Sequence, residues 1–193
     1  MAIATFKRYE KKFLVNQAQY DAIFPVLSEY MRLDKFCKND QEYTIYNIYY
    51  DTDNSSIIRH SLAKPFYKEK LRLRTYNTNI SPKATVFLEL KKKIDGVVTK
   101  RRATLTLAEA YNYLDHGIKP ADRDYLTGQV LNEIDYFRQI SPVRPAAYIS
   151  YDRQALFGLE DKEFRVTFDR NIISRCYDVS LEKGRFGKDL LFP

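Results

Sequence analysis

Basic side chains alternate with apolar ones along several stretches of this sequence. Lys70, Arg72 and Arg74 are separated by single leucines. Side chains of a β-strand point to opposite faces in turn, so the three cations would share one face and the leucines the other. The same alternation places Arg165 and Asp169 on one face of a later stretch. Such faces could bind the oxygen atoms of an anion, above all those of phosphate groups.

The most informative stretch carries an Asp-Gly pair between two β-forming runs. Asp-Gly in this setting is the strongest local signal for a two-residue hairpin turn of type I′. That turn would pair Lys91 with Lys100 and Glu89 with Arg102, all on one face. Directly opposed like charges destabilise a sheet by up to about 1 kcal/mol per pair. The two lysines therefore need either open water or an anion between them.

Two interpretations of these basic faces are open. A single basic strand is commonly the solvated face of a half-exposed sheet. Solvated faces usually mix Thr, Ser, Glu and Lys, however, whereas the candidate strands here concentrate Arg and Lys around isolated acids. Glu10 and Lys12 share such a face near the N-terminus, and Tyr151 and Arg153 share another. We therefore predict that the basic faces converge on one site for a phosphate-rich anion.

Other kinds of site have little material in this chain. Two histidines, His60 and His116, are too few for a histidine-based metal site or a Ser-His-Asp triad. Cys37 and Cys176 lack metal-like or redox-like spacing. Residues 184–189 lack the spacing and the Ser or Thr of a phosphate loop. Most of the tyrosines, which could stack on bases, fall at positions expected for the core.

The elements that must position these residues follow from periodicity and from capping signals. We predict strands at 8–15, 43–51, within 67–102, at 146–155 and at 164–172. We predict helices from Asn16 to about residue 31 with a kink or break at Pro25, from Thr106 to Gly117, and over 124–140. Residues 54–56 indicate a turn or a short helix start, and the tail from 184 could supply a further strand. Few crossover units occur, so the sequence predicts a mostly antiparallel α+β fold.

Composition bounds the class of protein. The 193 residues carry 32 Lys and Arg against 25 Asp and Glu, a net charge of +7. This length fits a single domain over residues 1–193, and the positive charge favours an anionic partner. The start of the chain lacks the apolar core of a signal peptide, and no run is long enough to span a bilayer. We therefore expect a cytoplasmic protein without a transmembrane segment.

Several short motifs lie along the chain in a distinctive order. They are Arg8-x-Glu10-x-Lys12-Phe13-Leu14-Val15, Ile48-Tyr49-Tyr50-Asp51-Thr52, Leu71-Arg72-Leu73-Arg74, Glu89-Leu90-Lys91, Lys100-Arg101-Arg102, Tyr151-Asp152-Arg153 and Arg165-Val166-Thr167-Phe168-Asp169. The ordered set resembles the VTC polyphosphate polymerase domain, a relative of the CYTH proteins among the triphosphate tunnel metalloenzymes. Hydrolases and cyclases of that superfamily show E-x-E-x-K at the first motif, and Arg8 in place of the first Glu favours the VTC branch.

The resemblance implies an eight-stranded antiparallel β-barrel or tunnel with flanking helices. It also implies a divalent metal, Mn²⁺ or Mg²⁺, held by acidic residues. The family ends with a strand that contains a Glu-x-Lys element, and nothing after Asp178 matches it. The barrel could therefore be incomplete at its C-terminus, lacking its last strand.

As a polymerase of this family, the chain would transfer the γ-phosphate of ATP onto a growing polyphosphate chain and release ADP. The resemblance implies catalytic roles for Arg72, Arg74, Lys91, Arg153 and Arg165, phosphate binding by Lys12, Lys70, Lys100 and Arg102, and metal binding by Glu89 with Glu10 or Asp169. For Glu10, a salt bridge is an equally good account. The expected partners are ATP and polyphosphate or triphosphate, without nucleic acid, and a membrane-protein partner is left open.

Three alternatives remain beside the polymerase. The first is a hydrolase of inorganic triphosphate. The second is a non-catalytic module that binds polyphosphate or inositol phosphates. The third is a protein that binds single-stranded RNA through basic strands and aromatic residues.

Overall fold

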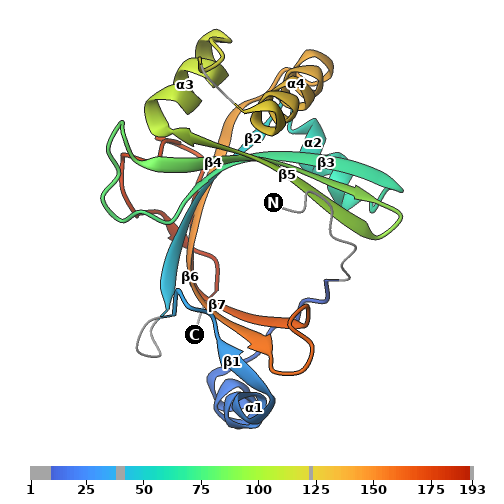
Figure 1. The fold of residues 1–193 in the computed structure, drawn as a ribbon, viewed down its shortest axis with the longest axis vertical. Coiled ribbons are helices and arrows are strands. Elements are labelled where there is room, and N and C mark those ends of the chain that lie inside the picture. The colour runs from blue at the N-terminus through green and yellow to red at the C-terminus, as the bar shows by residue number, and fades with distance from the viewer. Residues whose placement is uncertain (1–9, 38–41, 122–123, 192–193) are drawn as a thin grey trace.

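The computed structural model of the chain describes residues 10–37, 42–121 and 124–191. Within these residues, eight strands form one antiparallel sheet in the order β5-β4-β3-β2-β6-β7-β8, with β1 paired to β6 (Figure 1). The predicted α+β class and antiparallel arrangement are confirmed. The strands are β1 (Met31–Leu33), β2 (Tyr43–Asp51), β3 (Tyr67–Thr75), β4 (Thr85–Ile94), β5 (Val97–Thr106), β6 (Arg144–Gly158), β7 (Arg165–Arg175) and β8 (Lys188–Asp189), and the helices are α1 (Gln17–Tyr30), α2 (Ser56–Leu62), α3 (Leu107–His116) and α4 (Tyr125–Ile140).

Strands β4 and β5 form the hairpin that the sequence predicts. Asp95 and Gly96 have φ angles of 44° and 80°, and a type I′ turn requires positive φ at both central positions. Gly96 adopts this conformation without strain because it has no Cβ atom. Lys91 pairs with Lys100 as predicted, and the neighbouring positions follow in the same register. The turn thus fixes which charged residues face one another across the two strands.

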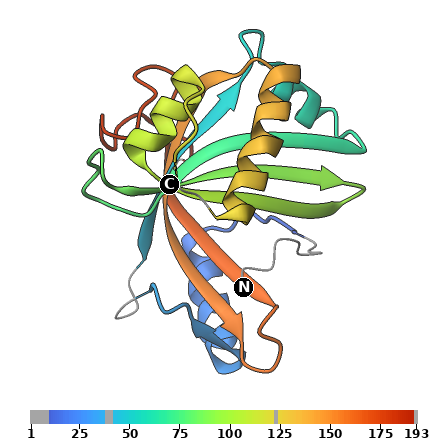
Figure 2. The ribbon, with the colours of Figure 1, turned by 45° about the horizontal axis from the view of Figure 1, so that its top comes forward.

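Helices α3 and α4 cover one face of the β3–β5 part of the sheet (Figure 2). The leucines of β3 and β4 point to this face and are fully buried, at 0% exposure. On α4, Val130, Ile134 and Phe137 repeat at helical spacing and pack into the same core. Because the apolar side chains use this face, the charged side chains that alternate with them lie on the opposite face.

Helix α1 covers the outer side of the β6–β7 arm, beyond β1 (Figure 1). Asn16 begins the helix with a reciprocal capping box. The helix continues past Pro25, so the break that the sequence allowed there does not occur. Tyr20 holds α1 on the sheet, because its ring lies 4.8 Å from that of Phe168 and its hydroxyl donates to Gln154 Oε1 at 2.8 Å. This packing leaves the inner side of the arm free for polar residues.

The predicted first strand does not form in the described residues. Residues 10–15 have no strand pairing, Phe13 and Leu14 are each 81% exposed, and Arg8 lies outside the described part of the chain. The prediction was wrong here because a period of two specifies a face and not a partner strand. The segment runs instead toward the β4–β5 hairpin (Figure 1). Within the described residues the sheet is therefore open along β5, in agreement with an incomplete barrel rather than a closed tunnel.

One buried arginine fastens the chain that follows β7. Arg175 is 3% exposed and donates hydrogen bonds to the backbone carbonyls of Asp178, Ser180, Gly184 and Phe186. These bonds hold the tail against the sheet, where β8 adds two residues to the edge of β7. The further strand expected in the tail is therefore present, although it is short.

Helix α4 offers a direct test of the core. We expect Ile134→Ala to lower the free energy of unfolding by about 2–5 kcal/mol, because the change removes fully buried methyl groups and leaves a cavity. Leu126→Ala on the same helix should cost less than about 1 kcal/mol, since Leu126 is 52% exposed. Urea unfolding followed by circular dichroism measures both values. Equal losses would show that α4 does not pack in this orientation.

Candidate functional site

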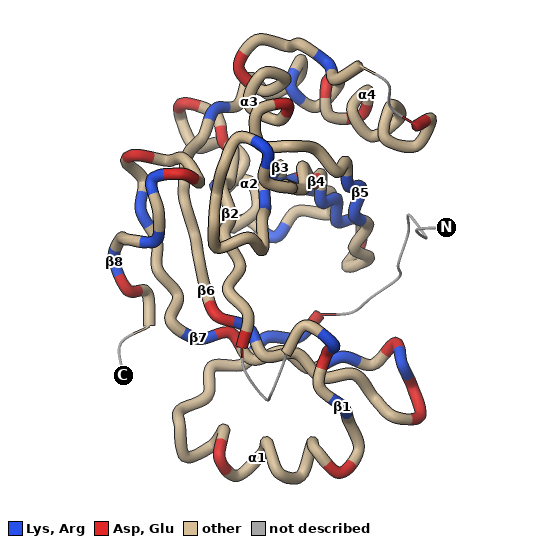
Figure 3. The backbone as a smooth tube through the Cα atoms, turned by 60° about the vertical axis from the view of Figure 1, so that its left-hand side comes forward, with Lys and Arg blue, Asp and Glu red and all other residues tan. Residues whose placement is uncertain are grey.

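Charged and polar side chains form rows across the face of the sheet that is turned away from α3 and α4. Residues paired directly across antiparallel strands carry their side chains on the same face, so register fixes each row. The central row is Tyr49, Arg72, Glu89 and Arg102; Lys70, Lys91 and Lys100 form the row on one side of it, and Asn47, Arg74 and Phe87 the row on the other. Figure 3 shows Lys and Arg along β3–β5 and along the β6–β7 arm. We call the charged members of these rows, with Arg153, Arg165 and Asp169, the basic face.

Glu89 is the centre of the basic face and is fully buried. Its Oε2 lies 2.6 Å from Arg72 Nε, and its Oε1 lies 2.7 Å from Arg102 Nε and 3.4 Å from Lys100 Nζ. Burial raises the pKa of the Glu89 carboxyl, but the charges of Arg72, Lys100 and Arg102 lower it by more, to about 2. The carboxylate of Glu89 on β4 thus holds three cations close together, one from β3 and two from β5.

The lysine row confirms the predicted opposition of like charges. Lys91 stands between Lys70 and Lys100 in the register of β3, β4 and β5. Burial lowers the pKa of Lys70, and the charges of Lys68 and Lys91 lower it further. Burial also lowers the pKa of Lys100, which the charge of Glu89 only partly offsets. An anion placed on this row would reverse those shifts, because it favours the charged form of each lysine.

Arg74 is the most enclosed cation of the basic face, with 5% exposure. Its Nε donates to Asn47 Oδ1 at 2.7 Å, its Nη2 to the Tyr151 hydroxyl at 2.9 Å and its Nη1 to the Tyr76 hydroxyl at 3.5 Å. All three partners are neutral, and no ion pair joins Arg74 to a carboxylate among the residues that the structure describes. A buried guanidinium without its own counter-ion is costly unless a ligand supplies the negative charge.

The β6–β7 arm brings two further predicted arginines to the same face. Arg153 binds Asp169 through two hydrogen bonds, of 2.6 Å and 2.7 Å, and its guanidinium lies 5.1 Å from the centre of the Tyr151 ring. Tyr151 also accepts from Arg74, so it links the arm to the central rows. Arg165 Nη2 lies 3.4 Å from Asp34 Oδ2. The cations of β3, β4, β5, β6 and β7 therefore lie on one face of the sheet, and their binding of one anion stays a prediction.

Lys12 is the exception among the predicted phosphate-binding residues. Its side chain is 82% exposed and lies 3.7 Å from Glu10 Oε1, while Glu10 Oε2 lies 3.5 Å from Lys91 Nζ. Burial raises the pKa of Glu10, but Lys91 and Lys12 lower it by more. Glu10 thus takes the salt-bridge role that the sequence allowed, with lysines as its partners. Lys12 joins the basic face through this bridge, and its charge also acts on Lys70.

The described residues do not fit the divalent metal that the fold family implies. Both oxygens of Glu89 are bound by arginines, Asp169 is bound twice by Arg153, and Glu10 is paired with lysines. Nowhere in the described ranges do three or more His, Cys, Asp or Glu side chains gather as metal ligands would. The metal-binding roles of Glu89, Glu10 and Asp169 therefore stay predictions that this geometry does not support, and we derive no step through a protein-bound metal.

Sequence reasoning missed the uncharged members of the site. Tyr49 receives a hydrogen bond from Arg72 Nη1 at 3.4 Å. Burial raises the pKa of this phenol, but Arg72, Arg74 and Lys91 together lower it by more. Asn47 and Tyr76 orient Arg74, as described above. A signal for two of these residues was present, because the alternation within β2 places Asn47 and Tyr49 on one face. The tyrosines were instead expected in the core, because that is where most tyrosine side chains of this pattern lie.

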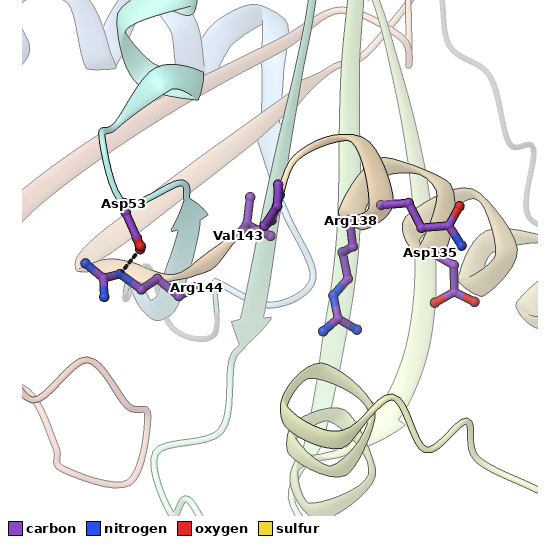
Figure 4. Close-up of a pocket in the computed structure, with 7 residues that line it drawn as sticks. Asp53, Asp135, Arg138, Val143 and Arg144 are labelled. Carbon is purple, nitrogen blue, oxygen red and sulfur yellow. Dashed lines mark ion pairs between the residues drawn. The ribbon is translucent and has the colours of Figure 1, made fainter.

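A shallow pocket on the outer side of the molecule is separate from the basic face. It lies beside the C-terminal end of α4 and the start of β6 (Figure 4). Its Arg144 forms an exposed ion pair with Asp53 at 2.7 Å, and its Arg138 donates to the carbonyl of Tyr113 at 3.0 Å. Both arginines thus have local partners, and Arg144 provides a control cation away from the site.

Comparison with known proteins identifies the family and the fold of the chain. The family described as VTC domain matches residues 7–191. The crystal structure of a "putative adenylate cyclase" from Bacillus halodurans matches with a TM-score of 0.50 and 16% sequence identity, covering 86% of this chain and 82% of that one. At this identity the likeness shows the fold alone. No curated protein matches the chain.

The low pKa of Glu89 leads to a pH dependence of stability. The folded-state pKa of about 2 lies below the ordinary value of 4.5. Ionised Glu89 therefore stabilises the fold above about pH 4.5, and this contribution, on the order of 3 kcal/mol, is lost as the pH falls toward 2. We expect Glu89→Gln to lower the free energy of unfolding at pH 7 and to flatten its change between pH 5 and pH 3.

Urea unfolding at several pH values measures this effect. Glu29→Gln, a change of an exposed acid on α1, is the matched control and should keep the wild-type pH profile. Tripolyphosphate should restore part of the stability of Glu89→Gln, because it supplies negative charge to the cations that the substitution leaves unpaired. The account of Glu89 fails if both variants show the wild-type pH profile.

Proposed function

Because the chain belongs to the VTC domain family, we propose that it is a polyphosphate polymerase, which transfers the γ-phosphate of ATP onto the end of a polyphosphate chain. The observation that carries the proposal is Arg74, a buried cation with neutral partners, in the row next to the cations of the central row. A polyphosphate carries negative charge on every phosphate along its length. Such a ligand supplies charge to all rows of the basic face at once.

The proposed reaction needs no side chain to remove a proton. The terminal phosphate of the polymer is already an anion at neutral pH, and one of its oxygens forms a bond to the γ-phosphorus of ATP. The bond from that phosphorus to the β–γ bridging oxygen breaks, and ADP leaves with the bridging oxygen. Catalysis then consists of aligning two anions and neutralising their charge. Arginines and lysines are sufficient for both tasks.

The arginines of the basic face are held in place before any ligand binds. Arg74 is oriented by Asn47 and Tyr151, and Arg153 is held by both oxygens of Asp169. Fixed guanidinium groups bind phosphate oxygens without the cost of ordering flexible side chains. We assign Arg72, Arg74, Arg153 and Arg165 to the reacting phosphates, together with Lys91. Lys70, Lys100 and Arg102 bind the rest of the polymer.

A second function is favoured by one observation. Each acid of the basic face is paired with cations, and an array of cations that only binds an anion suits a module that holds polyphosphate or inositol phosphates without catalysing a reaction. The hydrolase alternative requires water to reach the γ-phosphorus in place of the polymer end. Products distinguish the three functions: long polymer for the polymerase, orthophosphate for the hydrolase, and bound ligand without turnover for the module.

The location of the protein stays part of the proposal. No helix in the described ranges is long and apolar enough to cross a bilayer. Cys37 is buried and Cys176 exposed, and neither is in a disulfide. We propose a cytoplasmic protein, where ATP is available as the phosphate donor.

An activity assay with the double variant Arg72→Ala, Arg74→Ala tests the polymerase. ATP with Mn²⁺ or Mg²⁺ as its counter-ion should yield polymer on a gel with the wild-type chain. We expect the double variant to lose at least about 100-fold in rate, because two preorganised donors to the transferring phosphate are gone. Arg144→Ala removes an exposed arginine outside the site and should keep the wild-type rate.

Unfolding midpoints of all three proteins separate loss of activity from loss of the fold. Wild-type rates in a folded double variant would remove Arg72 and Arg74 from the mechanism. Orthophosphate without polymer would replace the polymerase with a hydrolase.

Binding of tripolyphosphate in the presence of EDTA tests the role of the cations without a metal. We expect binding to persist in EDTA and to weaken as salt rises, since the interaction is between charges. Lys100→Gln should weaken binding by roughly tenfold, because hydrogen bonds to charged groups contribute about 1.5–3 kcal/mol. Calorimetry measures the affinity, with Lys162→Gln on the exposed β6–β7 loop as the control. Binding that disappears in EDTA would contradict this account.

A further inference from the structure

Four aromatic rings from separate segments form a continuous row beside Arg74. The ring centroids of Phe36 and Tyr43 lie 6.2 Å apart, those of Tyr43 and Tyr76 6.0 Å, and those of Tyr76 and Phe87 5.7 Å. Phe36 follows β1, Tyr43 begins β2, Tyr76 follows β3 and Phe87 lies on β4. We call these four residues the aromatic row.

The aromatic row is not part of the hydrophobic core. Core aromatic residues such as Tyr113 and Tyr148 are 0% exposed, whereas Phe36 is 62% exposed and Tyr76 is 38% exposed. Rings that are held by neighbouring rings and still open to solvent offer apolar area for a planar ligand without the cost of ordering it. The ring pairs meet at 56–65° rather than stacking in parallel, and Lys35 Nζ lies 5.2 Å from the centroid of Phe36.

Cations of the basic face adjoin the row at three points. The Arg102 guanidinium lies 4.3 Å from the centroid of Phe87, that of Arg74 lies 5.9 Å from the centroid of Tyr76, and Arg165 Nη2 lies 3.5 Å from the hydroxyl of Tyr43. A ligand that touches the row therefore has arginines within reach. An aromatic group joined to several phosphates matches this combination, whereas a polyphosphate alone would leave the rings unused.

We propose that the aromatic row binds the base of a purine nucleoside triphosphate whose phosphates lie on Arg74 and Arg72. This inference rests on the proposed function. It adds a binding site for the base and the direction in which the nucleotide lies along the basic face. Phe87 and Lys91 are four residues apart on β4, roughly 13 Å along the strand. The base lies at the aromatic end of the basic face, the γ-phosphate at the central row, and the polymer along the lysine row. The acceptor thus reaches the γ-phosphate from the side opposite to the base.

Competition between ATP and tripolyphosphate tests the aromatic row, because only ATP carries a base. We expect Phe36→Ala to weaken ATP binding by roughly tenfold, in line with the loss of one aromatic stacking partner, and to leave tripolyphosphate binding within about twofold. Tyr76→Ala should weaken ATP binding by more than it weakens tripolyphosphate binding, which it also affects because Tyr76 accepts from Arg74. Phe36→Tyr keeps the ring and should bind ATP as the wild type does. Tyr125→Ala removes an exposed aromatic residue on α4 and is the control.

Each outcome decides between this inference and the proposed function. If the wild type binds tripolyphosphate and the variants keep full ATP affinity, the aromatic row is overturned and the phosphate site stands. If the variants lose tripolyphosphate and ATP equally, the rings only support Arg74, and the base site is again overturned. A wild-type chain that binds neither ligand overturns both proposals. Tighter binding of an oligoadenylate without a triphosphate would make the row an RNA site instead.

Discussion

A single buried carboxylate allows cations from neighbouring strands to lie side by side in this protein. Glu89 contacts Arg72, Arg102 and Lys100, and without it those positive charges would repel one another across β3, β4 and β5. One carboxylate cannot balance three cations, so the rows stay positive after Glu89 has been counted. Glu89 stabilises the three cations that it contacts, but an excess of positive charge remains on the basic face. The proposed ligands would neutralise that excess.

The two faces of the sheet depend on the same alternation of side chains. Leu71 and Leu73 are buried under α3 and α4 because Arg72 and Arg74 point the other way. A shift of one residue in register would place the cations in the core and the leucines in water. The Asp95-Gly96 turn prevents that shift in the β4–β5 hairpin, since a two-residue type I′ turn permits one pairing only. Turn geometry therefore decides both the core and the charge of the opposite face.

Much of the fold and of the site could be predicted from period-two patterns and from local signals. The β4–β5 hairpin, the capping box at Thr106 and the shared face of the cations all depend on neighbours in sequence. The first strand could not be judged in this way, because pairing of residues 10–15 requires a partner far along the chain. The metal roles of Glu10, Glu89 and Asp169 came from the resemblance to the family and stay predictions. The hairpin turn predicted Arg102 opposite Glu89, but Arg72 and Arg153, the partners of Glu89 and Asp169, lie on strands distant in sequence, and local signals could not place them.

The pairing of β2 with β6 has a consequence for how the protein folds. Tyr43 lies opposite Arg153, and Thr44 donates to Asp152 Oδ1 at a separation of 108 residues. Closing so long a loop is entropically costly and slow compared with forming a hairpin. The β3–β5 layer with α3 and α4 can form from contacts near in sequence, whereas Arg153 and Arg165 arrive only when the distant strands dock. The two halves of the basic face therefore assemble at different times, and the order of synthesis from the ribosome places the arm that completes it last.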